Sequence, residues 1–396
     1  MAKQKGAFSS FIIKLAIVAT GLSVAVMIVA MAIVTGFKYS IAEKLFSFMG
    51  HVHIVPFDET KANTLAPEPI YYDPALITAI RKIPHVVHVA PFAQRAVIVQ
   101  AHGQMEGLQM KGVTKEYRFL PGINTSGPGI NYTDTFYSKQ ILLSNTTADR
   151  LNINIGDTVQ LDFIESGAPR IRKVKVAGFF HSGMDEVDKT FGVCDLRLLQ
   201  RINNWPADSI NGYQVDLDDQ KYADTVSSFI HYNLINAPLE SYTTAENYSF
   251  IFEWLELQGM NGTILLVIMA IVAVTNMGAV LLILMVDRAA MIGLLKALGM
   301  PFETTRNIFL GIAGLIGASG ILLGNILALS LCWLQLRFGI VTLPEETYYM
   351  RYVPVKIIWW QVGVVDIVTL VLCIFCMWLP TLYIRRIQPA RVLQFK

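Results

Sequence analysis

Four long apolar runs, each almost free of charged side chains, constrain this chain more than any other feature. They cover about residues 15–36, 262–286, 308–336 and 357–384. At about 1.5 Å of rise per residue, each run exceeds the ~20 residues that a helix needs to cross a ~30 Å hydrocarbon core. A mean hydropathy of +0.46 and a charged fraction of 16% agree with this pattern. The sequence therefore predicts an α-helical membrane protein with four transmembrane helices.

The interval between the first two runs is long enough for a folded domain. We expect residues 1–37 to form an N-terminal segment and the first helix, 38–260 an α+β domain of two lobes, and 261–396 the other three helices. The stretch 124–131, with two glycines and a proline, is the predicted linker between the lobes. The tripeptide Ala30-Met31-Ala32 resembles a signal-peptide cleavage site. The first apolar run is longer than the apolar region of a signal peptide and continues past this site, so we expect it to stay as a membrane helix.

Lysine and arginine near the helix ends predict the orientation, because short basic loops stay in the cytoplasm. The N-terminal segment, the loop after the second run and the C-terminal tail together carry ten basic residues, against Asp287 and Glu303. These are Lys3, Lys5, Lys14, Arg288, Lys296, Arg306, Arg385, Arg386, Arg391 and Lys396. We therefore expect both termini in the cytoplasm and residues 38–260 outside it.

Local patterns in residues 38–260 predict both strands and helices. A hairpin is expected around His102-Gly103 and a turn at Gly156-Asp157. The expected strands cover residues 51–57, 96–101, 106–113, 141–144, 158–164, 170–180 and 213–217, and the expected helices 74–83, 222–232 and 246–258. The last of these helices runs on into the second membrane run, so we expect one continuous helix there.

Residues 287–300 form a short amphipathic segment between the second and third runs. Asp287 suits a helix N-cap, and Gly299 with Pro301 is a stop signal. The apolar face would consist of Met291, Ile292, Leu294, Leu295 and Leu298, with Lys296 on the polar side. A helix too short to span a bilayer and apolar on one face is expected to lie against a partner.

Few residues suggest chemistry. The sequence has no Gly-Lys dipeptide, so a phosphate-binding G-x-x-x-x-G-K loop is excluded and any ATP would be bound by another subunit. No G-x-S-x-G or H-E-x-x-H motif occurs. His51 with His53, and His181 with Asp185 and Asp188, are incomplete as metal sites, and we interpret both groups as structural.

Polar and small residues within the apolar runs are interpreted as packing features. Asp366 is expected to face the bundle and to bond a polar partner such as Asn276. The third run carries a stripe of glycines that would let it pack closely on its own bundle, at Gly311, Gly314, Gly317, Gly320 and Gly324. Cys373-x-x-Cys376 lies inside the fourth run, so buried thiols are a better interpretation than a redox motif. Cys194 is the one cysteine in residues 38–260, so no disulfide can form within that domain.

Several segments, taken in order, resemble permease subunits of the MacB/FtsX type of ABC transporter, most closely the LolC/LolE lipoprotein-releasing permeases. The resemblance covers nearly the whole chain. Its segments are Val34-Thr35-Gly36-Phe37, Gly50-His51-Val52-His53-Ile54, Ile155-Gly156-Asp157-Thr158-Val159, Val176-Ala177-Gly178-Phe179-Phe180 with Gly183, Glu186 and Asp188, residues 292–300, Tyr348-Tyr349 with Val353-Pro354-Val355, and Pro389-Ala390 with Val392-Leu393.

The resemblance implies a function and a set of partners. The chain would be a non-catalytic permease of the inner membrane that extracts lipoproteins from its outer leaflet by transmitting ATP-driven motion. Residues 287–300 would be the coupling helix on a cytoplasmic ATPase dimer, which binds ATP and Mg²⁺. A second permease, identical or paralogous, and membrane lipids complete the expected partners, and no nucleic acid is expected.

Two other functions stay open on the sequence. One is MacB-like efflux of a toxin or peptide, and the other is an FtsX-like signal relay that activates a cell-wall hydrolase. A lipoprotein chaperone is a further partner to consider, but the short interval Glu165–Pro169 argues against docking through the long loop that a chaperone-recruiting relative carries there. For cargo contact we select flexible and aromatic residues near the outer ends of the first two helices, namely Phe48, Met49, Phe252, Leu255 and Met260.

Overall fold

The computed structural model describes residues 2–57, 68–117, 123–132, 136–163, 170–287, 291, 294, 298–344, 348 and 350–384. The chain separates into two compact units. The first, which we call the helical bundle, contains Met1–Tyr39, Trp254–Leu343 and Tyr352–Lys396. The second, which we call the α+β domain, contains Ser40–Glu253 together with Pro344–Arg351.

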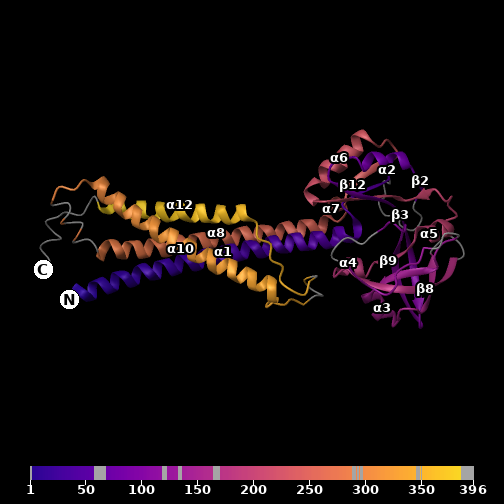
Figure 1. Cartoon of the computed structure of the whole chain (residues 1–396), viewed down its shortest axis with the longest axis horizontal. Helices are drawn as coiled ribbons and strands as arrows, with labels where there is room; N and C mark the ends of the chain where they lie inside the picture. Colours follow the sequence, from indigo (N-terminus) through magenta and orange to yellow (C-terminus); the bar gives the residue numbers. More distant parts are fainter. Residues whose placement is uncertain are drawn as a thin grey trace. The chain divides into compact units, whose positions relative to one another are not determined.

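Among the described residues, four helices are long and apolar enough to cross a membrane. They are α1 (Ala2–Met49), α8 (Ser249–Asp287), α10 (Phe302–Phe338) and α12 (Trp359–Ile384), and they run alongside one another in Figure 1. The prediction of four membrane helices, with an α+β domain between the first and the second, is confirmed. Both α1 and α8 extend well beyond the apolar runs that revealed them.

The bundle is held by two apolar clusters that draw on different helices. One includes Ala16 of α1, Met277 of α8, Phe309 of α10 and Cys373 of α12. The other joins α1 to α10 and α12 through residues such as Val24, Ala328 and Val365. Because van der Waals packing replaces the hydrophobic effect between helices in lipid, these contacts define the bundle.

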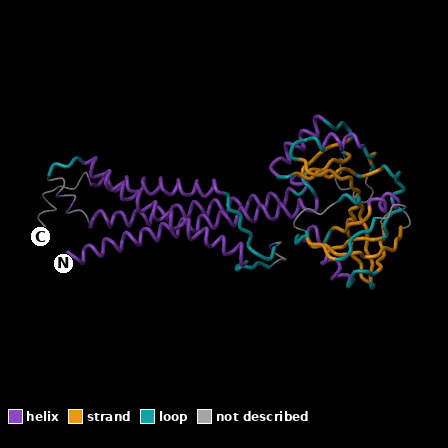
Figure 2. The backbone as a smooth tube through the Cα atoms, viewed as in Figure 1, coloured by secondary structure: helices purple, strands orange, loops and turns teal. Residues whose placement is uncertain are grey.

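The α+β domain contains one large sheet, drawn as orange tubes in Figure 2, with short helices packed around it. Its strands are β1 (Val52–Pro56), β3 (Val86–Ala101), β4 (Gln104–Val113), β5 (Asn124–Ser126), β6 (Gln140–Ser144), β7 (Thr158–Phe163), β8 (Arg170–His181), β9 (Phe191–Asp195), β11 (Gly212–Leu217) and β12 (Leu239–Thr243). A separate pair is formed by β2 (Ile70–Tyr71) and β10 (Ser209–Ile210). The helices are α2 (Pro74–Ile80), α3 (Asn145–Leu151), α4 (Asp185–Asp188), α5 (Leu196–Ile202), η1 (Gln220–Tyr222), α6 (Ala223–Asn233) and α7 (Thr244–Asn247).

The long strand β3 connects two parts of this sheet. Its first half pairs with β11, which continues through β1 to β12. Its second half pairs with both β4 and β7. From β4 the pairing passes through β9, β6 and β8 and returns to β7, so these strands close on themselves. Closure removes free edges from this part of the sheet.

Two predictions about this domain need correction. Asn124–Ser126, placed in the expected linker, form β5 and pair with β8, so this part of the stretch is a strand, and the division into two lobes stays a prediction. The sequence interpretation also missed β9, β12 and α5. Every residue of β9 is buried, because it lies between β4 and β6, and its short sequence shows no alternation of apolar and polar residues.

Candidate functional site

The C-terminal end of α1 is embedded in the core of the α+β domain. The Phe48 side chain is fully buried, and its ring centroid lies 5.5 Å from that of Phe180 on β8 and 5.3 Å from that of Phe191 on β9. Leu45 and Ile41, one and two turns earlier on the same helix, are also fully buried. The last turns of α1 therefore pack as core residues of this domain.

A buried lysine binds the last turn of α1. The Lys111 ammonium group, from β4, donates to the Phe48 carbonyl oxygen and to Gln214 Oε1, both at 2.6 Å. It also lies over the rings of Phe48 and Tyr117, 4.9 and 5.1 Å from their centroids. The Tyr117 hydroxyl donates to the same Phe48 carbonyl oxygen at 3.1 Å. One carbonyl at the end of a helix thus receives two side-chain donors.

The electrostatics at Lys111 are unusual because no carboxylate touches it. Among the described residues Lys111 forms no ion pair, and burial lowers its pKa to about 7, with nearby Asp216 acting in the opposite direction. Gln214 links the two groups, since its Nε2 donates to Asp216 Oδ1 at 2.9 Å. Asp216 in turn lies 3.4 Å from His88 Nδ1.

The chain leaves α1 through Gly50, whose φ of +83° favours glycine. A Cβ at this position would lie 2.4 Å from Gln214 Cγ. Gly50 is thus required both by its backbone conformation and by the side chain that accepts from Lys111.

The short helix α7, which precedes α8, is attached to the same place. Thr244, in α7, donates from its hydroxyl to the Gly50 carbonyl oxygen at 2.6 Å and from its backbone N–H to the His51 carbonyl oxygen at 3.0 Å. A capping box between Thr243 and Glu246 fixes the turn. The rings of Phe46 and Phe252 lie 5.7 Å apart, so the two long helices also touch directly here. We call the cluster of Phe48, Gly50, Lys111, Gln214 and Thr244 the helix joint.

The first histidine pair serves this packing. His51 stacks on Phe46 at 4.6 Å and accepts at Nδ1 from the Leu217 backbone N–H at 3.1 Å. His53 stacks on Tyr242, and burial lowers the pKa of His53 to about 3. Burial also lowers the pKa of His51, so both rings pack between strands as neutral groups near pH 7.

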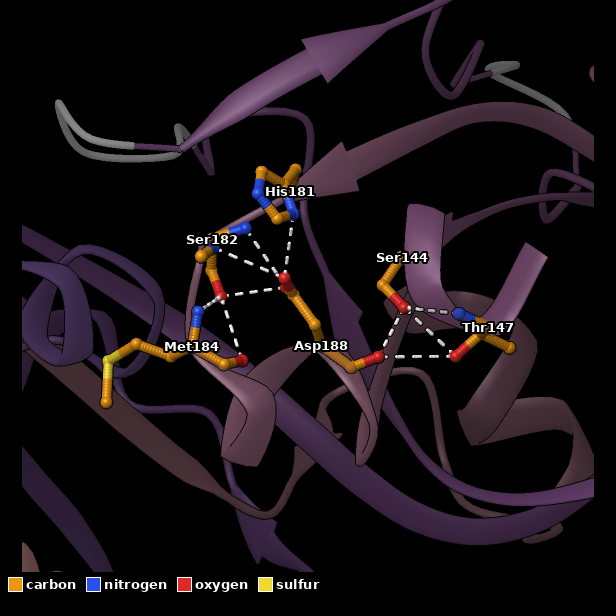
Figure 3. A network of polar contacts seen from close by, with 7 residues as sticks. Ser144, Thr147, His181, Ser182, Met184 and Asp188 are labelled. Carbon is orange, nitrogen blue, oxygen red and sulfur yellow. Dashed lines mark hydrogen bonds and ion pairs between the residues drawn. The ribbon is translucent and has the colours of Figure 1, made fainter. Parts of the chain in front are cut away.

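Asp188 organises the second group, as Figure 3 shows. Its Oδ1 accepts from the Ser182 backbone N–H at 3.0 Å and from the Ser182 hydroxyl at 2.7 Å, and its Oδ2 lies 3.0 Å from His181 Nδ1. The hydroxyls of Ser144 and Thr147 donate to its backbone carbonyl oxygen. Asp185 lies apart and pairs with Lys189.

This network closes the turn between β8 and β9, whose residues Phe180 and Phe191 hold Phe48. Because the carboxylate lies between the hydroxyl and the imidazole, the arrangement orders a turn and does not present an activated serine. The structural interpretation of His181 and Asp188 agrees with these contacts.

The residues selected for cargo contact differ in exposure. Phe48, Met49 and Leu255 are buried within the chain, and Phe252 is half-buried. Met260 on α8 is 55% exposed, so within a single chain it is the most accessible of the five. Contact between these residues and cargo stays a prediction.

The predicted coupling segment is described only in part. Asp287 is the last residue of α8 and has helical backbone, which differs from the expected N-cap, and Ile292, Leu295 and Lys296 lie outside the described residues. Met291, Leu294 and Leu298 are exposed, and the last of these is 77% exposed. Gly299 has a φ of +88°, as a helix-terminating glycine requires. The interval Glu165–Pro169 also lies outside the described residues.

Within the bundle, Asp366 of α12 accepts from Asn325 of α10. The Asn325 Nδ2 atom lies 3.0 Å from each carboxylate oxygen. The expected class of partner was right, but the expected residue, Asn276, was wrong. The sequence of a single helix does not show which of two asparagines on other helices lies opposite a given residue.

The glycine stripe packs over part of its length. A Cβ at Gly320 or Gly324 would lie within 2.8 Å of α1 atoms, and one at Gly317 would touch Cys373 of α12. Nothing lies within 4 Å of a Cβ at Gly311 or Gly314. The stripe prediction is confirmed for Gly317, Gly320 and Gly324.

Two of the quoted motifs meet at Gly36 of α1. A Cβ there would lie 2.5 Å from the Pro354 carbonyl oxygen, and the Lys356 backbone N–H donates to the Ala32 carbonyl oxygen at 3.0 Å. The Gln335 side chain holds this connection by bonding the backbone of Val341 and Val353. The Val-Pro-Val motif thus packs directly on the Thr-Gly-Phe motif.

Sequence reasoning missed Lys111, Tyr117, Gln214 and Thr244. Strand alternation places Lys111 on the face opposite Met110, which would normally face water. Here both faces of β4 are covered at this point, and both residues are fully buried. The one sequence feature that could have indicated this buried site was a lysine between Met110 and Gly112.

The family described as MacB-like periplasmic core domain matches residues 15–229, and the family described as FtsX-like permease C-terminal matches residues 263–389. The whole chain is 24% identical to the lipoprotein-releasing system transmembrane protein LolC of Xylella fastidiosa, of which it covers 96%. It is 23% identical to the LolE protein of Haemophilus influenzae, over 99% of this chain and 96% of that protein.

Solved structures match over about half of the chain. The extracellular domain of the transporter YknZ from Gram-positive bacteria aligns with a TM-score of 0.33 and 12% identity, covering 48% of this chain and 99% of that one. The periplasmic region of MacB from Actinobacillus actinomycetemcomitans aligns with a TM-score of 0.36 and 11% identity, covering 51% of this chain and 92% of that one.

Proposed function

Because the chain belongs to the MacB/FtsX family of ABC transporter permeases, we propose that it is the permease subunit of a transporter that releases lipoproteins from the inner membrane. The observation that carries this proposal is the end-to-end similarity to LolC, which covers the membrane helices and the α+β domain together. A separate ATPase supplies ATP hydrolysis, since the sequence lacks a phosphate-binding loop. A second permease completes the complex.

The proposed mechanism is transmission of movement through continuous helices. ATP binding by the ATPase moves the segment 287–300, and α8 and α1 carry that movement to the α+β domain. Three observations support this proposal. Both helices are unbroken over their described lengths, α1 ends in the helix joint, and Thr244 of α7, the short helix that precedes α8, binds Gly50 directly. A rigid connection passes on a displacement that a flexible linker would absorb.

The proposed cargo enters from the outer leaflet between the first and second membrane helices, α1 and α8 in this chain, of the two permeases. Met260 supports this route, because it is an exposed, adaptable apolar residue on α8. With both termini in the cytoplasm, the α+β domain lies in the periplasm, where released lipoprotein is handed on. A periplasmic chaperone that docks elsewhere than the interval Glu165–Pro169 is compatible with this arrangement.

The test is reconstitution of the chain with its ATPase and second permease in vesicles that contain an acylated lipoprotein. We expect ATP-dependent appearance of the lipoprotein in the soluble fraction when an acceptor is supplied. A non-acylated version of the same protein serves as the control and should give no ATP-dependent signal. ATP turnover without release would contradict the proposal and favour a signal relay, whereas export of a soluble peptide would favour efflux.

A further inference from the structure

The ammonium group of Lys111 is buried in an apolar core, where charged groups are rarely found. It is fully buried, and its two acceptors are neutral oxygens, the Phe48 carbonyl and the Gln214 amide. Transferring an ammonium group from water into such a site is costly unless its hydrogen bonds are replaced. An apolar side chain of similar length, such as methionine, would fill the same space without that cost. Stability alone therefore does not account for a lysine here.

What a lysine offers, and methionine does not, is a bond to the end of a helix. Phe48 lies in the last turn of α1, where carbonyl oxygens lack partners within the helix and the helix dipole is negative. A cation at this position satisfies an orphan carbonyl and interacts favourably with the dipole. The cation comes from β4, so the bond joins the helix to the sheet.

The same ammonium group connects three segments. It binds Phe48 of α1, it belongs to β4, and it binds Gln214 of β11. The Gln214 side chain also fills the space beside Gly50, where α1 ends. Tyr117, which follows β4, adds a second donor to Phe48. Movement of the end of α1 relative to the sheet would break these bonds together.

We propose that Lys111 is a positioning residue that locks the outer end of α1 to the sheet, so that movement of the helix becomes movement of the α+β domain. This inference rests on the proposed function and names the residue that couples ATP turnover to release. Without the lock, α1 still moves with the ATPase, but its end slides within the domain. ATP is then hydrolysed with little release.

The experiment compares lipoprotein released per ATP hydrolysed in the reconstituted complex. For Lys111→Met we expect ATP hydrolysis within about twofold of wild type and at least a tenfold fall in release per ATP. Lys111→Arg keeps a buried donor and a positive charge and should restore release at least partly. Lys175→Met, which removes an exposed lysine from β8, is the matched control and should behave as wild type.

A second variant covers the case in which Lys111→Met does not assemble. Gln214→Met removes one acceptor with little change of volume, and we expect a smaller, several-fold fall in release per ATP. Unchanged release per ATP in Lys111→Met overturns the proposal. If Lys111→Met fails to assemble, unchanged release per ATP in Gln214→Met overturns it instead. A wild-type complex that hydrolyses ATP without releasing lipoprotein contradicts the proposed function rather than this role of Lys111.

Discussion

At the scale of single residues, the proton on Lys111 links the helix joint to pH. Burial lowers the pKa of Lys111 to about 7, whereas a lysine in an unfolded chain titrates near ~10.4. Between these two values the unfolded chain binds more protons than the folded chain. The free energy of unfolding therefore rises with pH across this interval, because the unfolded state gains less from protonation as protons become scarce.

We predict that the full-length chain in detergent becomes more stable between about pH 7 and 8.5, by at most ~1.4 kcal/mol per pH unit from this group. Denaturant unfolding at several pH values measures the slope. Lys111→Met should remove this contribution, so the difference in slope between the two proteins is the decisive quantity. Measurements at higher pH are unsuitable, because burial raises the pKa of Cys194 and of Tyr117. Both groups then lower the free energy of unfolding as the pH rises, which opposes the effect of Lys111. Equal slopes would contradict the prediction.

Asp188 provides a second prediction at this scale. Asp188→Asn replaces a carboxylate that accepts from the Ser182 N–H and hydroxyl and faces His181. Since an amide has one accepting oxygen and would bring its own donors, buried partners lose their bonds. We expect a loss of about 2–4 kcal/mol in the free energy of unfolding.

Asp185→Asn is the matched control, because Asp185 is exposed and pairs with Lys189 one turn away. Exposed pairs of this kind contribute about 0.3–0.5 kcal/mol, so this variant should be nearly neutral. Denaturant unfolding of both variants under one condition makes the comparison. If the two losses were similar, the assignment of Asp188 as the centre of the turn would be wrong.

At the scale of elements, a packing constraint at Gly36 can be tested directly. A Cβ on Gly36 would lie 2.5 Å from the Pro354 carbonyl oxygen, a backbone atom that cannot rotate away. Gly36→Ala should therefore displace the connection between α10 and α12 and destabilise the bundle by about 1–3 kcal/mol. Thermal unfolding in detergent measures this loss. Gly314→Ala has nothing within 4 Å and should cost no stability. A Gly36→Ala protein as stable as Gly314→Ala would contradict the contact.

Helices and strands whose apolar residues recur at a regular spacing could be predicted from the sequence. Elements that are buried on all sides by neighbouring elements could not, because their residues show no such spacing. The membrane helices are recognised by long uncharged apolar runs, and the hairpin of β3 and β4 by the alternation of apolar and polar residues. The strand β9 is buried on both faces, so its residues carry no alternation. The extension of α1 to Met49 did have a signal, in the helical spacing of Ile41, Leu45 and Phe48, but the end of the apolar run at Gly36 concealed it.

The site was less predictable than the fold because its residues come from distant parts of the sequence. Lys111 and Phe48 are 63 residues apart, and Thr244 and Gly50 are 194 apart. No local pattern records such contacts. The resemblance marked Gly36 and Val353-Pro354-Val355 as separate motifs, and the contact between them appears only in the structure.

At the scale of the whole molecule, the continuity of α1 is the central feature. This helix contributes residues 2–39 to the bundle and Ser40–Met49 to the α+β domain. The helix α8 likewise contributes residues to both units. Under the proposed mechanism, a displacement of either helix would therefore reach residues of the α+β domain as well. The segment 287–300 begins at the last residue of α8, which makes it the proposed point of entry for that displacement.

We predict that Leu295→Asp abolishes association with the ATPase while the α+β domain stays folded. The apolar face of residues 287–300 is proposed to lie in a groove of the ATPase, where an unpaired carboxylate would cost several kcal/mol. Co-purification of the ATPase with a tagged chain measures the loss, and limited proteolysis reports on the α+β domain. Val87→Asp is the matched control, because Val87 is 64% exposed on β3, so a charge there meets water and should leave the complex intact. If Leu295→Asp still retained the ATPase and released lipoprotein, this segment would not be the coupling helix, and movement would have to enter the chain elsewhere.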